Sequence, residues 1–283
     1  MSAESGPFQT AFVLGGGGVL GAHEVGMLTA LAESSIRPDV ILGTSIGAVN
    51  GAMFAADPTV TGAERLGRLW SEMDFGATSV ATVLRRVSTL ARTGTHLQSP
   101  EELRRRLVEA LPVERVEELQ VPFQCVAASI ERAAEHWFTE GMLADVVLAS
   151  CAVPGVLPPV EIAGEHFIDG GIVNSIPVDR AVKLGAKTVF VLQVGRLERP
   201  LEPPRRPWEV GLVAFEVARR HRFAGDLVSL PPEVALHVLP TGGSVAPAYN
   251  DVAGQLRMGR LARGVGQAID SSYRASLRYL REL

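Results

Sequence analysis

The feature that most constrains this chain is an ordered unit near its N-terminus. Residues 10–14 form an apolar run typical of a buried strand, and the glycines at 15–18 follow directly. A helical pattern with apolar positions from Leu20 to Leu31 comes next, and then a second apolar run at 40–42. A strand, glycine loop, helix and strand in so short a span predict a parallel pair joined by a right-handed crossover. We therefore expect an α/β fold.

The second strand ends in a GxSxG pattern, Gly43-Thr44-Ser45-Ile46-Gly47, which opens a small-residue helical stretch at 46–56. This context makes Ser45 a candidate nucleophile at a sharp strand-to-helix turn, where the flanking Gly43 and Gly47 leave room for a crowded backbone. A serine hydroxyl is a poor nucleophile without a base and without donors for an oxyanion. The alternative is a tight turn with a capping serine.

The glycine loop, Gly16-Gly17-Gly18-Val19-Leu20-Gly21, matches the GxGxxG pattern of dinucleotide sites. Such a site needs an acidic residue at the far end of the next strand, whereas Asp39 precedes that strand. The loop and Ser45 instead follow neighbouring strands, at the edge where α/β sheets place active sites. The amides of Gly17, Gly18 and Val19 are therefore candidate oxyanion donors, with close helix-to-sheet packing as the alternative.

A base for Ser45 has to come from later in the chain. Of six histidines, only His221 and His237 come late enough for an α/β-hydrolase triad, but the first lies in a basic helical run and the second in an apolar strand pattern. Asp169 is the better candidate because it ends a strand and precedes Gly170-Gly171, although Asp-Gly is also a plain turn signal. A desolvated carboxylate beside Ser45 takes its proton directly.

Together these residues resemble the patatin-like phospholipases, a family of serine acyl hydrolases that use a Ser-Asp dyad. The ordered motifs span about residues 10–195: the glycine loop, GTSIGA at 43–48, ASCAVPGVLPP at 149–159, Asp169-Gly170-Gly171, Asn174, Pro177 and Leu184-Gly185-Ala186. The resemblance implies Ser45 as nucleophile, Asp169 as its base and an oxyanion hole from Gly16 to Val19. It also implies a three-layer α/β/α sandwich with a mostly parallel sheet.

For function, the resemblance implies hydrolysis of lipid acyl esters through an acyl-Ser45 intermediate, with no metal or organic cofactor. The chain departs from the family pattern at Leu20, where the loop usually carries Arg or Lys. Loss of one group that stabilises an oxyanion slows acyl transfer by about 10²–10³. Two alternatives stay open: a small-ester carboxylesterase or thioesterase, and a non-catalytic lipid-binding or partner-binding module on the same fold.

We expect one domain over residues 1–283. Residues 61–111 are interpreted as a helical cap over the site or as an outer layer of helices, and 195–207 as a surface loop. An amphipathic helix is expected within 251–283, and docking on the sheet is favoured over contact with an anionic membrane because its glycines weaken an autonomous helix. Further strands are expected at 123–129, 136–139, 160–162, 166–168, 188–194 and 234–239.

Bulk properties exclude several classes of protein. A net charge of −4 argues against a general nucleic-acid binder. The first ten residues lack the basic start and apolar core of a signal peptide, and the apolar region 141–160 carries Asp145 and three prolines, which predicts a buried segment and not a membrane span. Cys125 and Cys151 lie in apolar settings, which predicts buried free thiols. We therefore expect a cytoplasmic protein.

Overall fold

The computed structural model describes residues 8–72, 100–154, 156–194, 200–205, 207–243 and 262–283. Its strands are β1 (Thr10–Leu14), β2 (Val40–Thr44), β3 (Phe123–Ser129), β4 (Ala134–Phe138), β5 (Val160–Ile162), β6 (Glu165–Asp169), β7 (Thr188–Leu192) and β8 (Ala235–Val238). Its α-helices are α1 (Ala22–Glu33), α2 (Ile46–Ala56), α3 (Val60–Glu72), α5 (Pro100–Ala110), α6 (Leu143–Ser150), α7 (Gly171–Asn174), α8 (Val178–Lys183), α9 (Pro207–Val228) and α11 (Ala262–Arg281). Two short 3-10 helices are η1 (Gly18–Gly21) and η2 (Val116–Glu118).

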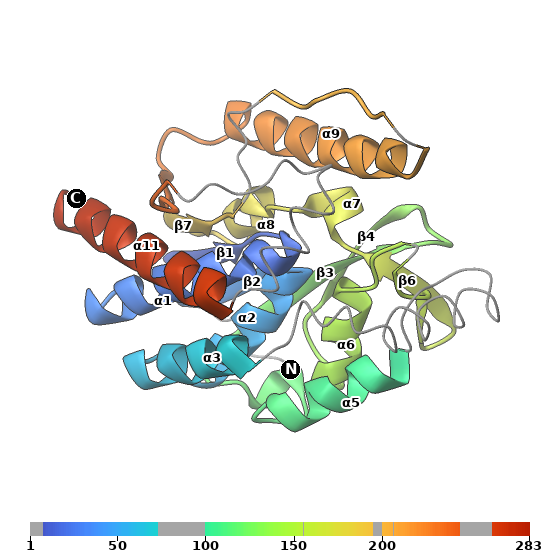
Figure 1. The fold of residues 1–283 in the computed structure, drawn as a ribbon, viewed down its shortest axis with the longest axis horizontal. Helices are drawn as coiled ribbons and strands as arrows, with labels where there is room; N and C mark the ends of the chain where they lie inside the picture. The colour runs from blue at the N-terminus through green and yellow to red at the C-terminus, as the bar shows by residue number, and fades with distance from the viewer. Residues whose placement is uncertain (1–7, 73–99, 155, 195–199, 206, 244–261) are drawn as a thin grey trace.

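The strands form one 8-stranded mixed sheet with the path β5-β6-β3-β2-β1-β7-β8, and β4 also pairs with β3. The pairs β3–β2, β2–β1, β1–β7 and β7–β8 are parallel, whereas the pairs made by β4, β5 and β6 are antiparallel. Parallel neighbours need crossover connections, and here these connections contain helices that cover the sheet (Figure 1). The expected α/β fold with a mostly parallel sheet is therefore confirmed.

The central strands are buried on both faces. In β1, Phe12 and Leu14 belong to one hydrophobic core, while Ala11 and Val13 belong to another, and β2 and β7 alternate in the same way. The first core includes side chains of α1, α2, α3, α6 and α11, and the second, smaller core includes those of α8 and α9. Two cores on opposite faces of one sheet make the three-layer α/β/α sandwich expected from the resemblance, and they explain why these strands read as continuous apolar runs.

The sequence pattern predicted most element positions closely. Strands at 10–14, 123–129 and 160–162 and the helix at 46–56 have their expected bounds. Five strands differ by one to two residues at their ends: β2 continues to 44, β4 covers 134–138, β6 covers 165–169, β7 ends at 192 and β8 covers 235–238. Leu20 lies in η1, and α1 begins at Ala22, because the chain leaves the glycine loop through a 3-10 turn before it becomes α-helical.

Two regions are described only in part. Within 61–111, α3 packs on α1 and α2 and α5 packs on α6, so both lie on the side of the first core (Figure 1). Residues 73–99 of that region lie outside the described residues, as do 195–199 and 206 of the expected surface loop. Pro207, the end of that expected loop, begins α9. No helix within the described ranges has the length and apolar character needed to cross a membrane.

The C-terminal helix α11 docks on α1. A Cβ built on Gly26 would lie 2.2 Å from the Ile269 carbonyl oxygen, so the two backbones approach closely at this point. The Tyr273 hydroxyl donates a 2.7 Å hydrogen bond to Glu33 Oε2, and Val265 and Ala268 are buried in the first core. These contacts show a docked helix, but it docks mainly on α1 and not on the sheet as expected. Residues 251–261 of this segment lie outside the described part of the chain.

We predict that Gly26→Ala destabilises the fold by about 1–3 kcal/mol, because the added methyl group overpacks the contact between α1 and α11. Gly67→Ala in α3 is the matched control, since its Cβ would meet Val25 Cγ1 at an ordinary 3.6 Å. Alanine is the better helix former, so this control is expected to stabilise the protein by up to about 1 kcal/mol. Urea unfolding measures both changes, and equal effects would contradict the close approach.

Candidate active site

One edge of β3 positions the site, because two strands share it. The opposite edge pairs with β4 along Cys125–Ser129. On the shared edge, β2 runs parallel until Thr44 lies opposite Val126, and β6 runs antiparallel and ends with Asp169 opposite Ala127. The carboxyl ends of β2 and β6 therefore meet end to end. This geometry brings the residue after β2, Ser45, beside Asp169 although the two are far apart in the sequence.

The predicted strand-to-helix turn is present at Ser45. Its φ is 54° and its ψ is −124°, a conformation that a residue with a side chain adopts only under constraint. A Cβ on Gly43 would lie 2.6 Å from Ala48 Cα, and one on Gly47 would lie 2.3 Å from the Leu14 carbonyl oxygen. Both flanking glycines are thus required by close backbone contacts, and the Ser45 side chain is left partly exposed at the start of α2.

The end of α6 holds the Ser45 backbone from both sides. The Ser45 amide donates a 3.0 Å hydrogen bond to Ser150 Oγ, whose hydroxyl donates in turn to the Val126 carbonyl at 2.7 Å. The Cys151 thiol donates to the Ser45 carbonyl at 3.1 Å. The Asp169 amide donates to the next carbonyl, that of Ala152, at 2.9 Å. We call residues 150–152 the clamp, because they bind the backbones of Ser45 and Asp169 together.

The Asp169 carboxyl is buried and only 1% of the residue is exposed. Its Oδ1 accepts a 2.8 Å hydrogen bond from the Gly171 amide, whereas Oδ2 has no partner with hydrogen-bond geometry among the described residues. Burial raises the pKa of Asp169 to about 6, and the nearby Ser45 side chain and the Gly171 amide oppose this rise. The Ser45 hydroxyl is thus close enough to the carboxyl to affect its pKa. An oxygen of this kind is suited to accept a proton.

The glycine loop lies against Ser45. A Cβ on Gly16 would be 3.4 Å from Ser45 Cβ, and one on Gly17 would be 2.1 Å from Val194 Cγ2. Gly18 has a φ of +56°, which favours glycine. The Gly16 amide donates to the Ser175 carbonyl at 3.0 Å, so it is engaged within the fold. Of the four candidate oxyanion donors, Gly16 to Val19, the amides of Gly17, Gly18 and Val19 therefore remain.

A buried polar network holds the far end of this loop. Asn50 Nδ2 donates to the Gly21 carbonyl at 3.0 Å and to Glu24 Oε2 at 2.7 Å, and Trp70 Nε1 donates to Asn50 Oδ1 at 2.8 Å. Burial raises the pKa of Glu24 well above its usual range, against smaller opposing effects of Asn50 and Arg219. Burial thus disfavours the charged form of Glu24. The network gives the loop a rigid end, beside the position where Leu20 replaces a cation.

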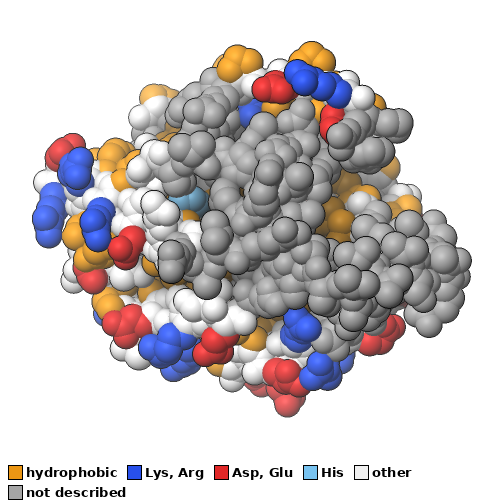
Figure 2. Space-filling view, viewed as in Figure 1, with side chains coloured by type: hydrophobic (Ala, Val, Ile, Leu, Met, Phe, Trp, Pro, Cys, Tyr) orange, Lys and Arg blue, Asp and Glu red, His pale blue; other side chains and the backbone are white. Residues whose placement is uncertain are grey.

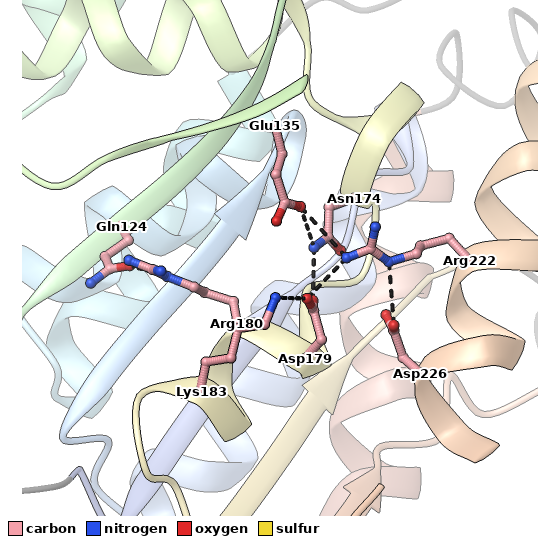
Figure 3. Close-up of polar contacts among 8 residues, drawn as sticks. All are labelled: Gln124, Glu135, Asn174, Asp179, Arg180, Lys183, Arg222 and Asp226. Carbon is pink, nitrogen blue, oxygen red and sulfur yellow. Dashed lines mark hydrogen bonds and ion pairs between the residues drawn. The ribbon is translucent and has the colours of Figure 1, made fainter. Parts of the chain in front are cut away.

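A second polar cluster ties the segment after Asp169 to α9 (Figure 3). The Thr44 hydroxyl donates to the Asn174 carbonyl at 2.9 Å, which links β2 to the end of α7. Asn174 Nδ2 donates to Glu135 at 3.0 Å and to Asp179 at 2.8 Å. Arg222 of α9 donates to the same Asp179 at 2.9 Å. The segment that follows Asp169 is thus fixed between the sheet and α9.

The histidine alternatives are placed elsewhere. His221 is exposed on α9. His237 lies in β8, which β7 and β1 separate from β2, and its ring stacks on Phe190 at a centroid distance of 4.9 Å. Within the described part of the chain, neither histidine has a contact with Ser45 or Asp169. This arrangement favours the carboxylate over a histidine as the base.

Both cysteines are free thiols, as expected, and one of them contacts Ser45 directly. Cys125 is fully buried in β3, whereas Cys151 is half-buried beside Ser45. Burial raises the pKa of the Cys151 thiol well above its usual range, and the Asp169 charge adds to this effect. The thiol therefore stays protonated and acts as a donor. The roles of Cys151, Ser150 and Asn50 were not visible in the sequence, because each depends on a contact made across the fold.

Comparisons with known proteins agree on one family. The family model described as "Patatin-like phospholipase" matches residues 12–182. Over 187 residues the chain is 33% identical to patatin-like phospholipase domain-containing protein 6 of Mus musculus, a match that covers 65% of this chain and 13% of the relative. It is 30% identical over 195 residues to lysophospholipase nte1 of Aspergillus terreus, covering 66% of this chain and 12% of the relative. The match thus spans only about an eighth of these relatives.

Among solved structures, the chain is similar to the crystal structure of VipD from Legionella pneumophila. The sequence identity is 14% and the TM-score is 0.48, with 98% of this chain and 67% of the VipD chain covered.

We predict that Ser150→Ala slows the reaction of Ser45 with a fluorophosphonate by about 10²-fold, the order expected when a reacting group is slightly misplaced. Ser129→Ala removes another buried serine hydroxyl, which is bonded to Glu165 away from Ser45. This control is expected to lower the unfolding temperature without slowing the labelling of Ser45. Equal labelling rates in the two variants would contradict a positioning role for Ser150.

Proposed function

Because the chain belongs to the patatin-like phospholipase family, we propose that it is a lipid acyl hydrolase in which Ser45 is the nucleophile and Asp169 is its general base. The observation that carries this proposal is the end-to-end meeting of β2 and β6 on β3. A strained serine and a buried carboxyl with one unengaged oxygen lie at that meeting point. These are the two groups that acyl transfer through a dyad requires.

In the first half of the proposed reaction, Asp169 Oδ2 takes the hydroxyl proton as Ser45 Oγ attacks the acyl carbonyl carbon. Negative charge then develops on the carbonyl oxygen, and the amides of Gly17, Gly18 and Val19 are the proposed donors to it. The C–O bond of the ester breaks, and Asp169 returns the proton to the leaving alcohol. The products are a free alcohol and an acyl-Ser45 ester.

In the second half, the carboxylate of Asp169 takes a proton from a water molecule that attacks the acyl-Ser45 carbonyl. The tetrahedral intermediate collapses, the fatty acid leaves, and the proton returns to Ser45 Oγ. The clamp at 150–152 keeps the two side chains at one separation through both halves, because its hydrogen bonds hold both backbones. The residues do not specify the acyl chain or the headgroup.

The relatives' names support a lipid ester as the substrate class, since both are named as phospholipases or lysophospholipases. A cytoplasmic location belongs to the proposal and is supported by the free thiols of Cys125 and Cys151, which suit a reducing compartment. Contact with a membrane surface is also part of the proposal, because the substrates of such an enzyme reside in lipid aggregates.

We predict that the unmodified protein is labelled by a fluorophosphonate and hydrolyses phospholipid, and that Ser45→Ala abolishes both. Asp169→Asn is expected to lower turnover by about 10²–10⁴-fold, because an amide cannot accept the proton. His237→Ala is the control. It is expected to keep the turnover of the unmodified protein, whereas it would lose activity if His237 were the base of a triad. No labelling of the unmodified protein at any pH would favour a non-catalytic binding module instead.

The raised pKa of Asp169 sets the expected pH dependence. The group accepts a proton only as a carboxylate, and its pKa is about 6, so activity is expected to rise with pH through 6 and then level off. A carboxyl with an ordinary pKa would already give full activity at pH 5. The rate of hydrolysis of a soluble ester between pH 4 and 8 measures this profile, and a flat profile from pH 5 upward would contradict the proposed base.

A further inference from the structure

The outer face of α9 is apolar, which is unusual for a surface helix. Among the α9 side chains whose exposure is described, none of the exposed ones is Asp, Glu, Lys or Arg. Val210, Val217 and Val228 are 55%, 52% and 89% exposed. They recur at helical spacing and, with small exposed residues and one histidine, cover a single face. This outer face of α9 consists of Val210, Ala214, Val217, His221, Ala224, Gly225 and Val228.

The charged residues of α9 whose burial is described lie buried or beside this face, and several form ion pairs. Glu216 and Arg219 are buried and lie 3.0 Å apart, and Arg220 also pairs with Glu216 at 2.9 Å. Arg222 binds Asp179 at 2.9 Å and Asp226 at 3.2 Å (Figure 3). A surface helix normally turns its apolar stripe inward and its charges outward. Here most of the ion pairs lie within α9, the pair with Asp179 joins the helix to α8, and an apolar strip remains on the surface.

This strip lies on the side of the molecule that carries the candidate base. α9 packs on α7, which begins two residues after Asp169, and a Cβ on Gly171 would lie 2.6 Å from Phe215 Cζ. α9 lies at the top of Figure 1, below the coil that leads into it, and hydrophobic side chains together with a few charged ones appear along the upper edge in Figure 2. Whatever binds the outer face of α9 is therefore held one helix away from the segment that bears Asp169.

We propose that the outer face of α9 docks the protein on a lipid surface that contains anionic headgroups. The strip runs from Val210 to Val228, so it measures about 28 by 10 Å, or about 300 Å². A stable dimer needs about 800 Å² on each partner, which argues against a second copy of the chain. The strip also offers valine, alanine and glycine and no large aromatic anchor of the kind that dominates protein interfaces.

Charge at the flanks supports the same occupant. Arg220 and Arg222 have side chains that are 21% and 39% exposed, whereas Glu216 and Asp226, with which they pair, are 2% and 11% exposed. The accessible part of these ion pairs is thus cationic, which complements phosphate and carboxylate headgroups. The proposal rests on the proposed function, because a lipid acyl hydrolase has to meet its substrate at such a surface.

Sedimentation with vesicles of phosphatidylcholine and phosphatidylserine tests the docking separately from catalysis, with Ser45→Ala as the common background so that no lipid is consumed. The background protein is expected to bind these vesicles, and Val210→Glu with Val217→Glu to weaken the partitioning at least about tenfold. Val108→Glu is the matched control, because Val108 is 54% exposed on α5, away from α9. It is expected to bind as the background does.

Val217→Ser with Val228→Ser gives a milder pair of changes should the glutamates disturb folding, and it is expected to weaken binding in the same direction. Vesicle binding that is absent, or unchanged in both α9 variants, would overturn the proposal. So would a dimer, seen by light scattering, that only the α9 variants dissociate, because the face would then belong to a second copy.

With Ser45 intact, unchanged hydrolysis of a short soluble ester in the α9 variants supports docking, and loss of that activity overturns it. Vesicle binding without any hydrolysis would reject the proposed function and leave the docking surface standing.

Discussion

The partner exchange along one edge of β3 is the constraint on which the rest of the site depends. A strand edge has a single row of hydrogen-bonding groups, so β6 can pair there only where β2 has stopped. β2 stops at Thr44 because the Ser45 turn carries the chain out of the sheet, and β6 takes the next position with Asp169. The meeting of the proposed nucleophile and the proposed base is therefore a consequence of how two strands share one ladder.

This arrangement places two contributions that oppose folding close together. A positive φ at a residue with a side chain costs about 1–3 kcal/mol, and burial opposes the ionisation of Asp169. Neither condition persists unless surrounding groups enforce it. The enforcement comes from the clamp at 150–152, from the α2 amides that bind the Ser45 carbonyl, and from the two hydrophobic cores that keep the sheet in place.

Local patterns predicted an α/β fold and most strand bounds, and the family resemblance implied the three layers. The patterns also singled out Ser45 and Asp169, which the ends of β2 and β6 bring together. Apolar runs mark strands buried on both faces, and GxSxG and Asp-Gly-Gly mark turns that free a side chain. The pattern did not predict that the Gly16 amide would donate a hydrogen bond to the Ser175 carbonyl. Nor did it predict that the Ser150 hydroxyl would accept one from the Ser45 amide. Those contacts join segments far apart in the chain. The reversed polarity of α9 was equally hidden, since Arg222 meets Asp179 and Glu135 across the fold.

The two cores on either side of the sheet are unequal, and this inequality has a kinetic consequence. The layer of α8 and α9 contributes few buried apolar side chains and carries several ion pairs. Salt screens partly exposed ion pairs but does not screen apolar contacts. Local opening of a protein begins where buried apolar contacts are fewest. Amide hydrogens of α8 and α9 should thus exchange with solvent earlier than those of α1 and α2, and faster as salt is added. The burial that raises the pKa of Asp169 therefore depends in part on the layer of α8 and α9, which is expected to open first.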